Sequence, residues 1–565
     1  MWIEEAEELF KGYFPYYLLI VLPMFIIISP IKPASAAYDF PVYRMQHFDV
    51  VAFSTQYSGS FPNSTPKQNG QFGSRSASVN LEARSLHSWS TSRHCVVTRI
   101  QDLTVDHFHN IRNKAGALLI IIPEDLSSLS IEEKQHLMVL EDVMLSHEIQ
   151  IPVYFVTWTP EIEKILGEIS TNIVPEDKVK SAAETLVNSI AANGYQVVIN
   201  PRSPNAKQDV QIATLTGSLP GYDGNLPAII VVAHYDSFGV APELSFGADS
   251  NGSGVAVLLE LMRLFSVLYS DPKTHGKYNM IFALSGGGKL NYIGSKKWLE
   301  EEHTDLNTNP GVNYVMCLDT LAASDSIYMH VSKPPNATAA PGAVVFMDNL
   351  NATAQRHTTV NFDLIHKRIH LREILLPWEH ERYSLKRVHA FTLSSLKNHK
   401  DPYRRTILDT TKNFNMDRLV QNTQFIAEAL AGFVYNASDG NLFGGTLKVE
   451  HSHLEAWIRF LSSQPRSPQL LSGKDNPVVN FLKDSFNKYL RNVQVKYIVH
   501  EKDPDFVLYE VTKSTVNFYS VKPAVFDLIL TLIIVVYLGG VYLVIQNFSG
   551  LYKVACNVTK KSKVQ

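Results

Sequence analysis

The alternation of short apolar runs with amphipathic segments predicts an α/β fold. Runs rich in β-branched residues at 115–123 and 151–157 are typical of buried strands. The residues between them, at 131–147, follow helical spacing. A strand, a helix and a second strand at this distance predict an N-terminal α/β lobe, which we assign to residues 38–175.

A second and more apolar series of elements predicts a doubly wound sheet. Its strands end in polar residues, as at the carboxyl edge of a parallel sheet, where α/β proteins place their functional sites. The predicted domain runs from residue 176 to residue 440. Its helices are predicted at 181–194 and 255–269, and its strands at 227–237, 280–285, 312–320 and 389–395.

Two stretches depart from this pattern. Residues 58–79 are rich in Ser, Gly, Asn and Pro, which predicts a flexible surface loop. Residues 441–520 contain amphipathic helical patterns at 453–463 and 480–493. We interpret this second stretch as a smaller membrane-proximal region.

Apolar segments at both ends predict a membrane protein. The first segment is followed by Ala34-Ser35-Ala36, a pattern typical of a cleaved signal peptide, here 1–36; an uncleaved anchor is the alternative. The second segment, 524–548, would extend about 37 Å as a helix and cross a bilayer. Basic residues in the tail, 549–565, place that tail in the cytosol by the positive-inside rule. They are Lys553, Lys560, Lys561 and Lys563.

This topology places residues 38–520 in the lumen, where N-glycosylation takes place. Candidate glycosylation sites in Asn-X-Ser/Thr sequons are Asn63, Asn251, Asn336, Asn351 and Asn436. In the membrane segment, Asp527 is costly unless it faces a partner, and Gly539 and Gly540 allow another helix to approach closely. These three residues are candidate contacts with membrane partners.

Charge and cysteine content exclude two classes of protein. The chain has 51 Lys and Arg residues against 54 Asp and Glu residues. It therefore lacks the basic surplus of a nucleic-acid-binding protein. Three cysteines are too few for a disulfide scaffold. Their spacing leaves open whether Cys95 and Cys317 are bridged.

Four polar clusters follow predicted strands, as the ligands of a two-metal hydrolase do. Imidazole nitrogens and carboxylate oxygens at one sheet edge can hold two divalent ions, while a further Glu deprotonates a water. One cluster alone is a weak signal, but the four in this order are much more specific. They are HYDS at 234–237, GADSNGSG at 247–254, CLDT at 317–320 and WEHERY at 378–383.

In this order the clusters resemble the M28 family of zinc aminopeptidases and carboxypeptidases, over residues 229–435. Within that family the chain is most similar to the nicastrin/nicalin branch, and specifically to nicalins. The similar stretches extend over nearly the whole chain and include the membrane segment. They are VYRMQ, VVAHYDSFGVAP, GADSNGSGV, SGGGK, HVSKPP, HKRI, WEHER and VKPAVFDL. The resemblance implies an M28 aminopeptidase-like, doubly wound α/β domain.

The resemblance also implies remnants of a metal site. His234, Asp319 and His380 match metal ligands of the peptidases. Asp236 matches the carboxylate that orients a metal-bound histidine. Glu379 and Glu381 flank His380, which leaves a single weakly held ion as an alternative to an empty site.

Other positions of the peptidase pattern are lost. Ser250 stands where the bridging aspartate is expected, and Asp249 lies one position too early. Counted back from Gly294-Ser295, the catalytic base and its neighbouring ligand are replaced by Gly288 and Lys289. Glycine accepts no proton and an ammonium is not a metal ligand. The pattern therefore predicts a pseudo-peptidase without a cofactor.

Lys289 has a structural interpretation. Its ammonium could pair with Asp319 or Asp249 and so replace the charge of the lost ion. Two other chemistries are not supported, because GGGK lacks the spacing of a phosphate loop and the GxSxG motif of a serine hydrolase is missing.

The resemblance to nicalins implies a non-catalytic scaffold in the endoplasmic reticulum membrane, single-pass and of type I. The implied partners are nodal modulator, transmembrane protein 147 and the Sec translocon with its ribosome, with no direct nucleic-acid contact. The implied roles are multi-pass membrane protein biogenesis and an influence on Nodal signalling and receptor assembly. The alternative is a residual lumenal metallo-aminopeptidase, and the missing Glu pair favours the scaffold.

Overall fold

The computed structural model describes residues 37–51, 69–171 and 194–547, with residues 550 and 553, apart from short gaps in the last range. The predicted signal peptide, the sequon at Asn63 and almost all of the predicted helix at 181–194 lie outside the described residues. The gaps are at 203–204, 208–210, 224, 307–310, 358, 371–374, 438–441, 446, 499–505, 512 and 522–523.

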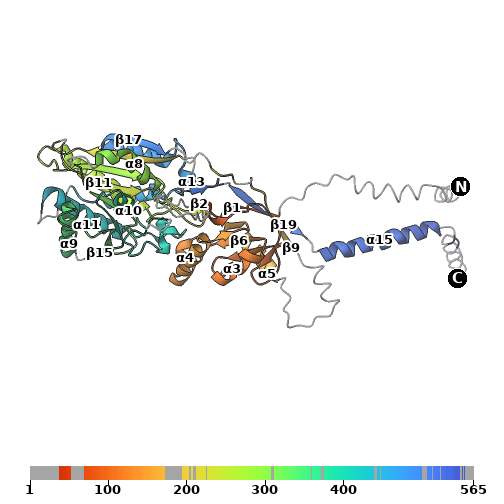
Figure 1. The fold of residues 1–565 in the computed structure, drawn as a ribbon. Coiled ribbons are helices and arrows are strands. Elements are labelled where there is room, and N and C mark those ends of the chain that lie inside the picture. The colour runs from red at the N-terminus through yellow and green to blue at the C-terminus, as the bar shows by residue number, and fades with distance from the viewer. Residues whose placement is uncertain are drawn as a thin grey trace.

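Within the described residues, eight strands form a mixed sheet in the order β15-β14-β16-β13-β11-β12-β10-β17. Figure 1 labels three of them, β11, β15 and β17. The central strands β12, β11, β13 and β16 run parallel, so their carboxyl ends meet at one edge. The bounds are β10 (Ile212–Leu219), β11 (Ala228–His234), β12 (Asn279–Ser285), β13 (Val312–Leu318), β14 (Ser326–Val331), β15 (Asn361–His366), β16 (Ala390–Ser394) and β17 (Arg491–Ile498).

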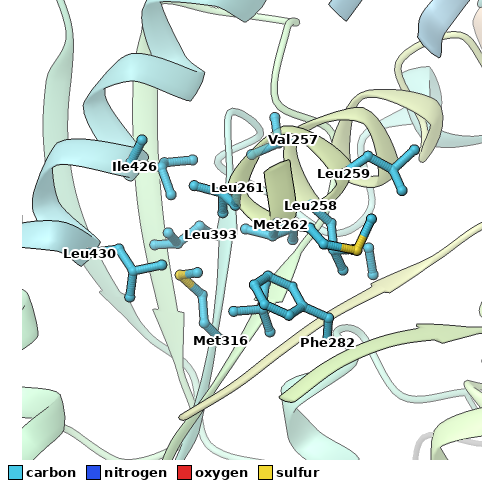
Figure 2. Close-up of a cluster of buried hydrophobic side chains, with 14 of the residues drawn as sticks. Val257, Leu258, Leu259, Leu261, Met262, Phe282, Met316, Leu393, Ile426 and Leu430 are labelled. Carbon is cyan, nitrogen blue, oxygen red and sulfur yellow. The ribbon is translucent and has the colours of Figure 1, made fainter. Parts of the chain in front are cut away.

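Helices cover both faces of this sheet, as the predicted doubly wound domain requires. On one face, apolar side chains of α7 and α11 meet Phe282, Met316 and Leu393 from the strands (Figure 2). On the other face, Trp298 and Tyr383 pack against the sheet. The first face carries α7 (Gly252–Ser270), α9 (Pro341–Arg356), α11 (Met416–Tyr435), α12 (His451–Leu461) and α14 (Pro477–Tyr489), and the second carries α8 (Ile293–Leu306) and α10 (His380–Leu385).

The N-terminal lobe is built on a closed barrel in the order β1-β19-β9-β4-β5-β6-β8. Helices α3 and α4 pack on one side of its strands, and α5 packs against the other. The bounds are β1 (Tyr38–Arg44), β4 (Val79–Ser85), β5 (His94–Arg99), β6 (Ala117–Ile122), β8 (Val153–Thr157), β9 (Gly194–Ile199), β19 (Ser514–Val521), α3 (Val105–Lys114), α4 (Ile131–Leu145) and α5 (Pro160–Thr171).

A smaller sheet has the order β18-β2-β3-β7. Along the chain, its strands are interspersed with those of the barrel. Its strand β3 falls within the stretch 58–79, which was predicted to be a loop. The polar residues of β3 form a strand because β2 pairs with Asn69–Gly73 and β7 pairs with its end. The bounds are β2 (His47–Val51), β3 (Asn69–Ser74), β7 (Glu148–Ile149) and β18 (Phe506–Leu508).

The sheets cut across the predicted domain boundaries. Strand β9 comes from the predicted domain 176–440 and β19 from the predicted region 441–520, yet both complete the barrel of the N-terminal lobe. In the same region, α12 and α14 add Leu454 and Leu482 to the core of the large sheet. Residues 441–520 are therefore not a separate unit, because their apolar faces are buried in both neighbouring cores.

Helix α15 (Ala524–Gln546) follows β19 and extends away from the barrel (Figure 1). Its apolar side chains are exposed, with Leu528 at 70% and Tyr537 at 67%. Among the described helices, α7 meets the length and hydropathy requirement for a membrane span, but 78% of it is buried and it is a core helix. The apolar described part of α15, Leu530–Leu543, is shorter.

The two cysteines of the main body are not bridged. Cys95 lies in the barrel strand β5 and Cys317 in β13 of the large sheet, and both are buried and free. Burial raises the pKa of the Cys95 thiol to about 12. The thiol therefore stays protonated and unreactive at neutral pH.

Candidate functional site

The four polar clusters meet at the carboxyl edge of the large sheet. His234 ends β11, Asp319 follows β13, and His380 begins α10. Every side chain of this group is at most 2% exposed, so the site is a closed interior and not an open cleft. The group consists of His234, Asp236, Asp249, Ser250, Asp319, Glu379, His380 and Glu381.

A buried ion pair replaces metal ligation at Asp319. Arg404 donates from Nη2 to Asp319 Oδ2 at 2.5 Å, and Thr320 donates from Oγ1 to Asp319 Oδ1 at 2.7 Å. Burial acts to raise the pKa of Asp319, but Arg404, His234 and Lys289 together hold it well below its usual range. Asp319 is therefore a carboxylate whose two oxygens are already engaged.

Arg404 is itself held on several sides. Its Nη1 donates to the carbonyl oxygen of Pro377 at 3.1 Å, and its Nη2 also donates to the hydroxyl of Tyr292 at 3.2 Å. Its guanidinium carbon lies 4.5 Å from the ring centroid of Trp378, a cation–π geometry. These contacts surround a planar guanidinium and would not suit a compact ammonium group.

Lys289 points into the site but does not pair with Asp319 or Asp249, so the predicted ion pair is wrong in its partners. Its Nζ donates to Ser250 Oγ at 2.7 Å and to the Arg404 carbonyl oxygen at 3.4 Å. Burial, and then the charge of Arg404, lowers the pKa of Lys289 to about 8. Arg404 takes the carboxylate of Asp319 instead, through its Nη2.

Gly288 lies directly against the imidazole of His234. A Cβ at this position would sit 2.2 Å from His234 Cγ. The other side of the ring meets Glu379, whose Oε2 is 3.5 Å from His234 Nδ1. Glu379 is fixed in turn by Ser285 and Ser295, which donate to its Oε1 at 2.6 and 2.5 Å. The glycine is therefore required by the packing of His234.

Asp236 does not orient His234 in this structure, contrary to the role that the resemblance implies. Its two oxygens accept the backbone N–H groups of Gly288 and Lys289, at 2.7 and 2.9 Å. This pair of hydrogen bonds fixes the loop after β12 in place of a metal-bound residue.

Asp249 forms a second buried acidic centre with Asp409. The Asp409 carboxylate accepts the backbone N–H groups of Asp249 and Ser250, each at 2.8 Å. Asp249 Oδ1 accepts from Ser253 Oγ at 2.5 Å and from the N–H of Ala322 at 3.0 Å. Burial, and then the charge of Asp409, raises the pKa of Asp249 to about 7. Asp249 thus braces the loops that carry Ser253 and Ala322.

His380 is the third matched position. Its Nδ1 lies 2.9 Å from Thr392 Oγ1, and its ring is buried. Burial, and then the neighbouring His330, lowers the pKa of His380 to about 3. The imidazole is therefore neutral at any physiological pH.

The sequon at Asn251 cannot carry a glycan in this fold. Asn251 is fully buried at the start of α7, and its Nδ2 donates to the carbonyl oxygens of His234 and Leu318 at 3.1 and 2.8 Å. Its Oδ1 accepts from the N–H groups of Gly254 and Thr320. The exposed candidates are Asn336, Asn351 and Asn436.

Two arginines of the site were not predicted. Arg404 lies 85 residues from Asp319 in the sequence. The only sequence feature that could have pointed to it is the pair of adjacent arginines that follows the predicted strand at 389–395. Arg466 is fully buried and donates to the carbonyl oxygens of Tyr235, Leu461 and Gly247. Arg466 thereby fixes the HYDS loop. The sequence around Arg466 contains no motif that would have predicted this role.

The residues do not fit two zinc ions. Both oxygens of Asp319 are engaged, Ser250 is neutral, and two cations, Arg404 and Lys289, point inward. The Nε2 atoms of His234 and His380 are buried and have no hydrogen-bond partner. Across the described residues, however, no group of three or more His, Cys, Asp and Glu side chains is placed to hold an ion. The single-ion alternative therefore also lacks a ligand set.

The buried acid Asp249 predicts a pH dependence. Its folded-state pKa of about 7 lies above the ~3.9 of an unfolded aspartate, so its contribution to stability is full below pH ~3.9 and is lost as the pH rises through 7. We expect the free energy of unfolding to fall between pH 5 and 7, by at most about 1.4 kcal/mol per unit. Thermal unfolding of Asp249→Asn should show a flatter profile. Asp142→Asn, at an exposed position, should keep the parent's slope, and an unchanged slope in Asp249→Asn would contradict the assignment.

Comparison with known proteins agrees with this fold. Residues 212–430 match Peptidase family M28. The chain is 40% identical to BOS complex subunit ncln of Danio rerio, over 98% of each chain, and 38% identical to BOS complex subunit NCLN of Homo sapiens, over 100% of each. The crystal structure of the γ-secretase component nicastrin superposes with a TM-score of 0.56 at 11% identity, covering 86% of this chain and 100% of nicastrin.

The fold and the site define an M28 peptidase-like α/β protein with an internal arginine in its candidate site. The predicted fold class is thereby confirmed. A relative named Nicalin, from Caenorhabditis elegans, is 28% identical over 93% of each chain. The chain belongs to the nicalin family, and the resemblance stated from the motifs is confirmed.

Proposed function

We propose that this chain is a non-catalytic subunit of a membrane protein complex, the BOS complex of its organism. One observation carries the proposal: the identity to proteins named as BOS complex subunits extends over 98–100% of the chain and is not confined to the M28 match. An enzyme role is disfavoured, because Gly288 supplies no base and Arg404 takes the carboxylate that a metal would need.

In this proposal the His234, Asp319 and His380 positions are remnants of a two-metal site that now serve packing. The partners are nodal modulator and transmembrane protein 147, at the Sec translocon of the endoplasmic reticulum. The process is the biogenesis of multi-pass membrane proteins, with effects on Nodal signalling and receptor assembly. Full-length relationship to BOS complex subunits supports the existence of partners, and the nicalin resemblance supports their identity.

Helix α15 is the proposed membrane anchor, with the large domain in the lumen. Its exposed apolar side chains have no described partner in the chain itself, and the lysines behind it favour a cytosolic tail. Asp527, Gly539 and Gly540 are the proposed contacts with partner helices. Asn336, Asn351 and Asn436 are the proposed glycan positions.

The Gly540→Leu variant tests this proposal. A Cβ at Gly540 meets nothing within 4 Å, so the chain alone tolerates a larger residue there. If another membrane subunit packs closely on α15, leucine should reduce the recovery of that subunit at least about threefold after mild detergent extraction. The measurement is quantitative mass spectrometry of proteins that co-purify with the tagged full chain.

Val535→Leu is the matched control, because residue 535 is exposed on a different face of the same helix. It should leave the recovered subunits unchanged. Equal recovery with Gly540→Leu and with the parent would place the contact elsewhere. A parent chain that co-purifies with no other membrane protein would contradict the proposed function itself.

A further inference from the structure

One segment of the chain joins the closed site to the N-terminal lobe. Residues 401–413, which we name the strap, connect β16 to α11. The strap contains the short 3₁₀ turns η3 (Pro402–Arg405) and η4 (Thr411–Asn413). Its two sides differ in chemistry, since charged side chains enter the site and apolar ones enter the lobe.

The site side of the strap carries Arg404 and Asp409. Arg404 forms the buried ion pair with Asp319. Asp409 accepts the N–H groups of Asp249 and Ser250, and its own carbonyl oxygen accepts the N–H of Ala248 at 3.2 Å. The strap therefore fixes two of the loops that close the site, the one after β13 and the one before α7.

The lobe side of the strap carries Ile407 and Leu408. Both belong to the apolar core that includes Leu137 and Met144 of α4, and they are 1% and 4% exposed. Glu141, also on α4, accepts the backbone N–H of Ile407 through its Oε1 at 3.0 Å. The strap thus completes the core of the lobe and is hydrogen-bonded by its helix.

The far end of the strap is also anchored to the lobe. Lys134 donates from Nζ to Asn413 Oδ1 at 3.0 Å and to the carbonyl oxygen of Ser127 at 3.1 Å. A further pair, Lys412 with Asp125, is largely exposed and contributes little.

We infer that the strap couples the Arg404–Asp319 pair to the packing of the N-terminal lobe, so that the former metal site now holds the lobe in place. Coupling of this kind needs a contiguous series of packed or bonded groups, and the strap supplies one from Asp319 to α4. The lobe lies between the large sheet and α15 (Figure 1), and its barrel strand β19 leads directly to α15. The strap therefore connects the closed site to the lobe whose strand β19 precedes α15.

Hydrogen–deuterium exchange on the full chain in detergent micelles tests the coupling. In Arg404→Met, amide exchange should rise about tenfold or more in the strap and also in α4, which is hydrogen-bonded to the strap at Ile407 and Asn413. Lys400→Met is the matched control, because Lys400 is exposed and immediately precedes the strap. It should leave α4 at the parent's rate.

The reciprocal variant starts from the other end. Coupling is symmetric, so Glu141→Leu should raise exchange at the Asp249 and Ser250 amides, while Gln135→Leu, at an exposed position of the same helix, should not. If Arg404→Met does not fold, Arg404→Lys takes its place, because it keeps the charge and removes the planar guanidinium. Exchange in Glu141→Leu tests the coupling separately, since that variant leaves Arg404 intact. Faster exchange confined to the strap in the Arg404 variant, or confined to α4 and the strap in the Glu141 variant, would overturn the coupling. Neither result depends on which partners the chain binds.

Discussion

Replacing Arg404 with methionine should lower the free energy of unfolding by about 3–5 kcal/mol, because it leaves the buried carboxylate of Asp319 without its partner. Methionine keeps much of the volume against Trp378 but carries no charge. For a chain of this length the midpoint of thermal unfolding should fall by about 3–4 °C. Scanning fluorimetry of the purified chain in detergent measures this directly.

Two further variants separate the charge from the packing. Lys400→Met, at the exposed position before the strap, should change the midpoint by no more than about a degree. The double variant Arg404→Met/Asp319→Asn removes both charges and should recover most of the loss, since a neutral pair of similar volume is tolerated in an interior. A midpoint of Arg404→Met equal to that of the parent would mean that the ion pair does not hold the site.

The parts of the fold that could be predicted are those with a strong local pattern. The predicted strand at 227–237 and helix at 255–269 match β11 and α7, because their apolar residues are consecutive or helically spaced. Strand β19 could not be placed, because it joins β1, whose residues lie at the other end of the chain. Strand β3 is polar and depends on β2 for its pairing. Long-range pairing of this kind leaves no local signal.

The candidate site also has a part that could be predicted from the sequence and a part that could not. That the polar clusters would meet at one edge followed from parallel strands ending together, and the structure brings His234, Asp319 and His380 there. The partner of Asp319 could not be predicted, because Lys289 and Arg404 are both cations within reach of the edge. Geometry decides between them, since the strap presents a guanidinium to Asp319 while the backbone of Lys289 is tied to Asp236.

Restoring the missing base should damage the protein and not revive a peptidase. In Gly288→Glu the new Cβ would lie 2.2 Å from the ring of His234, so the ring or the loop must move. The glutamate would also add a negative charge beside Glu379 in a closed interior. Overpacking costs about 1–3 kcal/mol, and the unpaired buried charge adds to it, so we expect a loss of at least about 3 kcal/mol. Thermal unfolding of the full chain gives the size of the loss.

Gly288→Ala measures the steric part alone, and Gly167→Ala is the control, because a Cβ at Gly167 in α5 meets nothing within 4 Å. The alanine at 288 should cost about 1–3 kcal/mol, whereas the alanine at 167 should raise stability by about 1 kcal/mol, because alanine is the better helix former. In Gly288→Glu/Lys289→Glu both lost carboxylates return, yet Ser250 still cannot bridge two ions and Arg404 still binds Asp319. Elemental mass spectrometry should find well below one zinc per chain in the parent and in this double variant. Close to two zinc ions per chain in either protein, with hydrolysis of an aminoacyl substrate, would restore the metallo-aminopeptidase hypothesis.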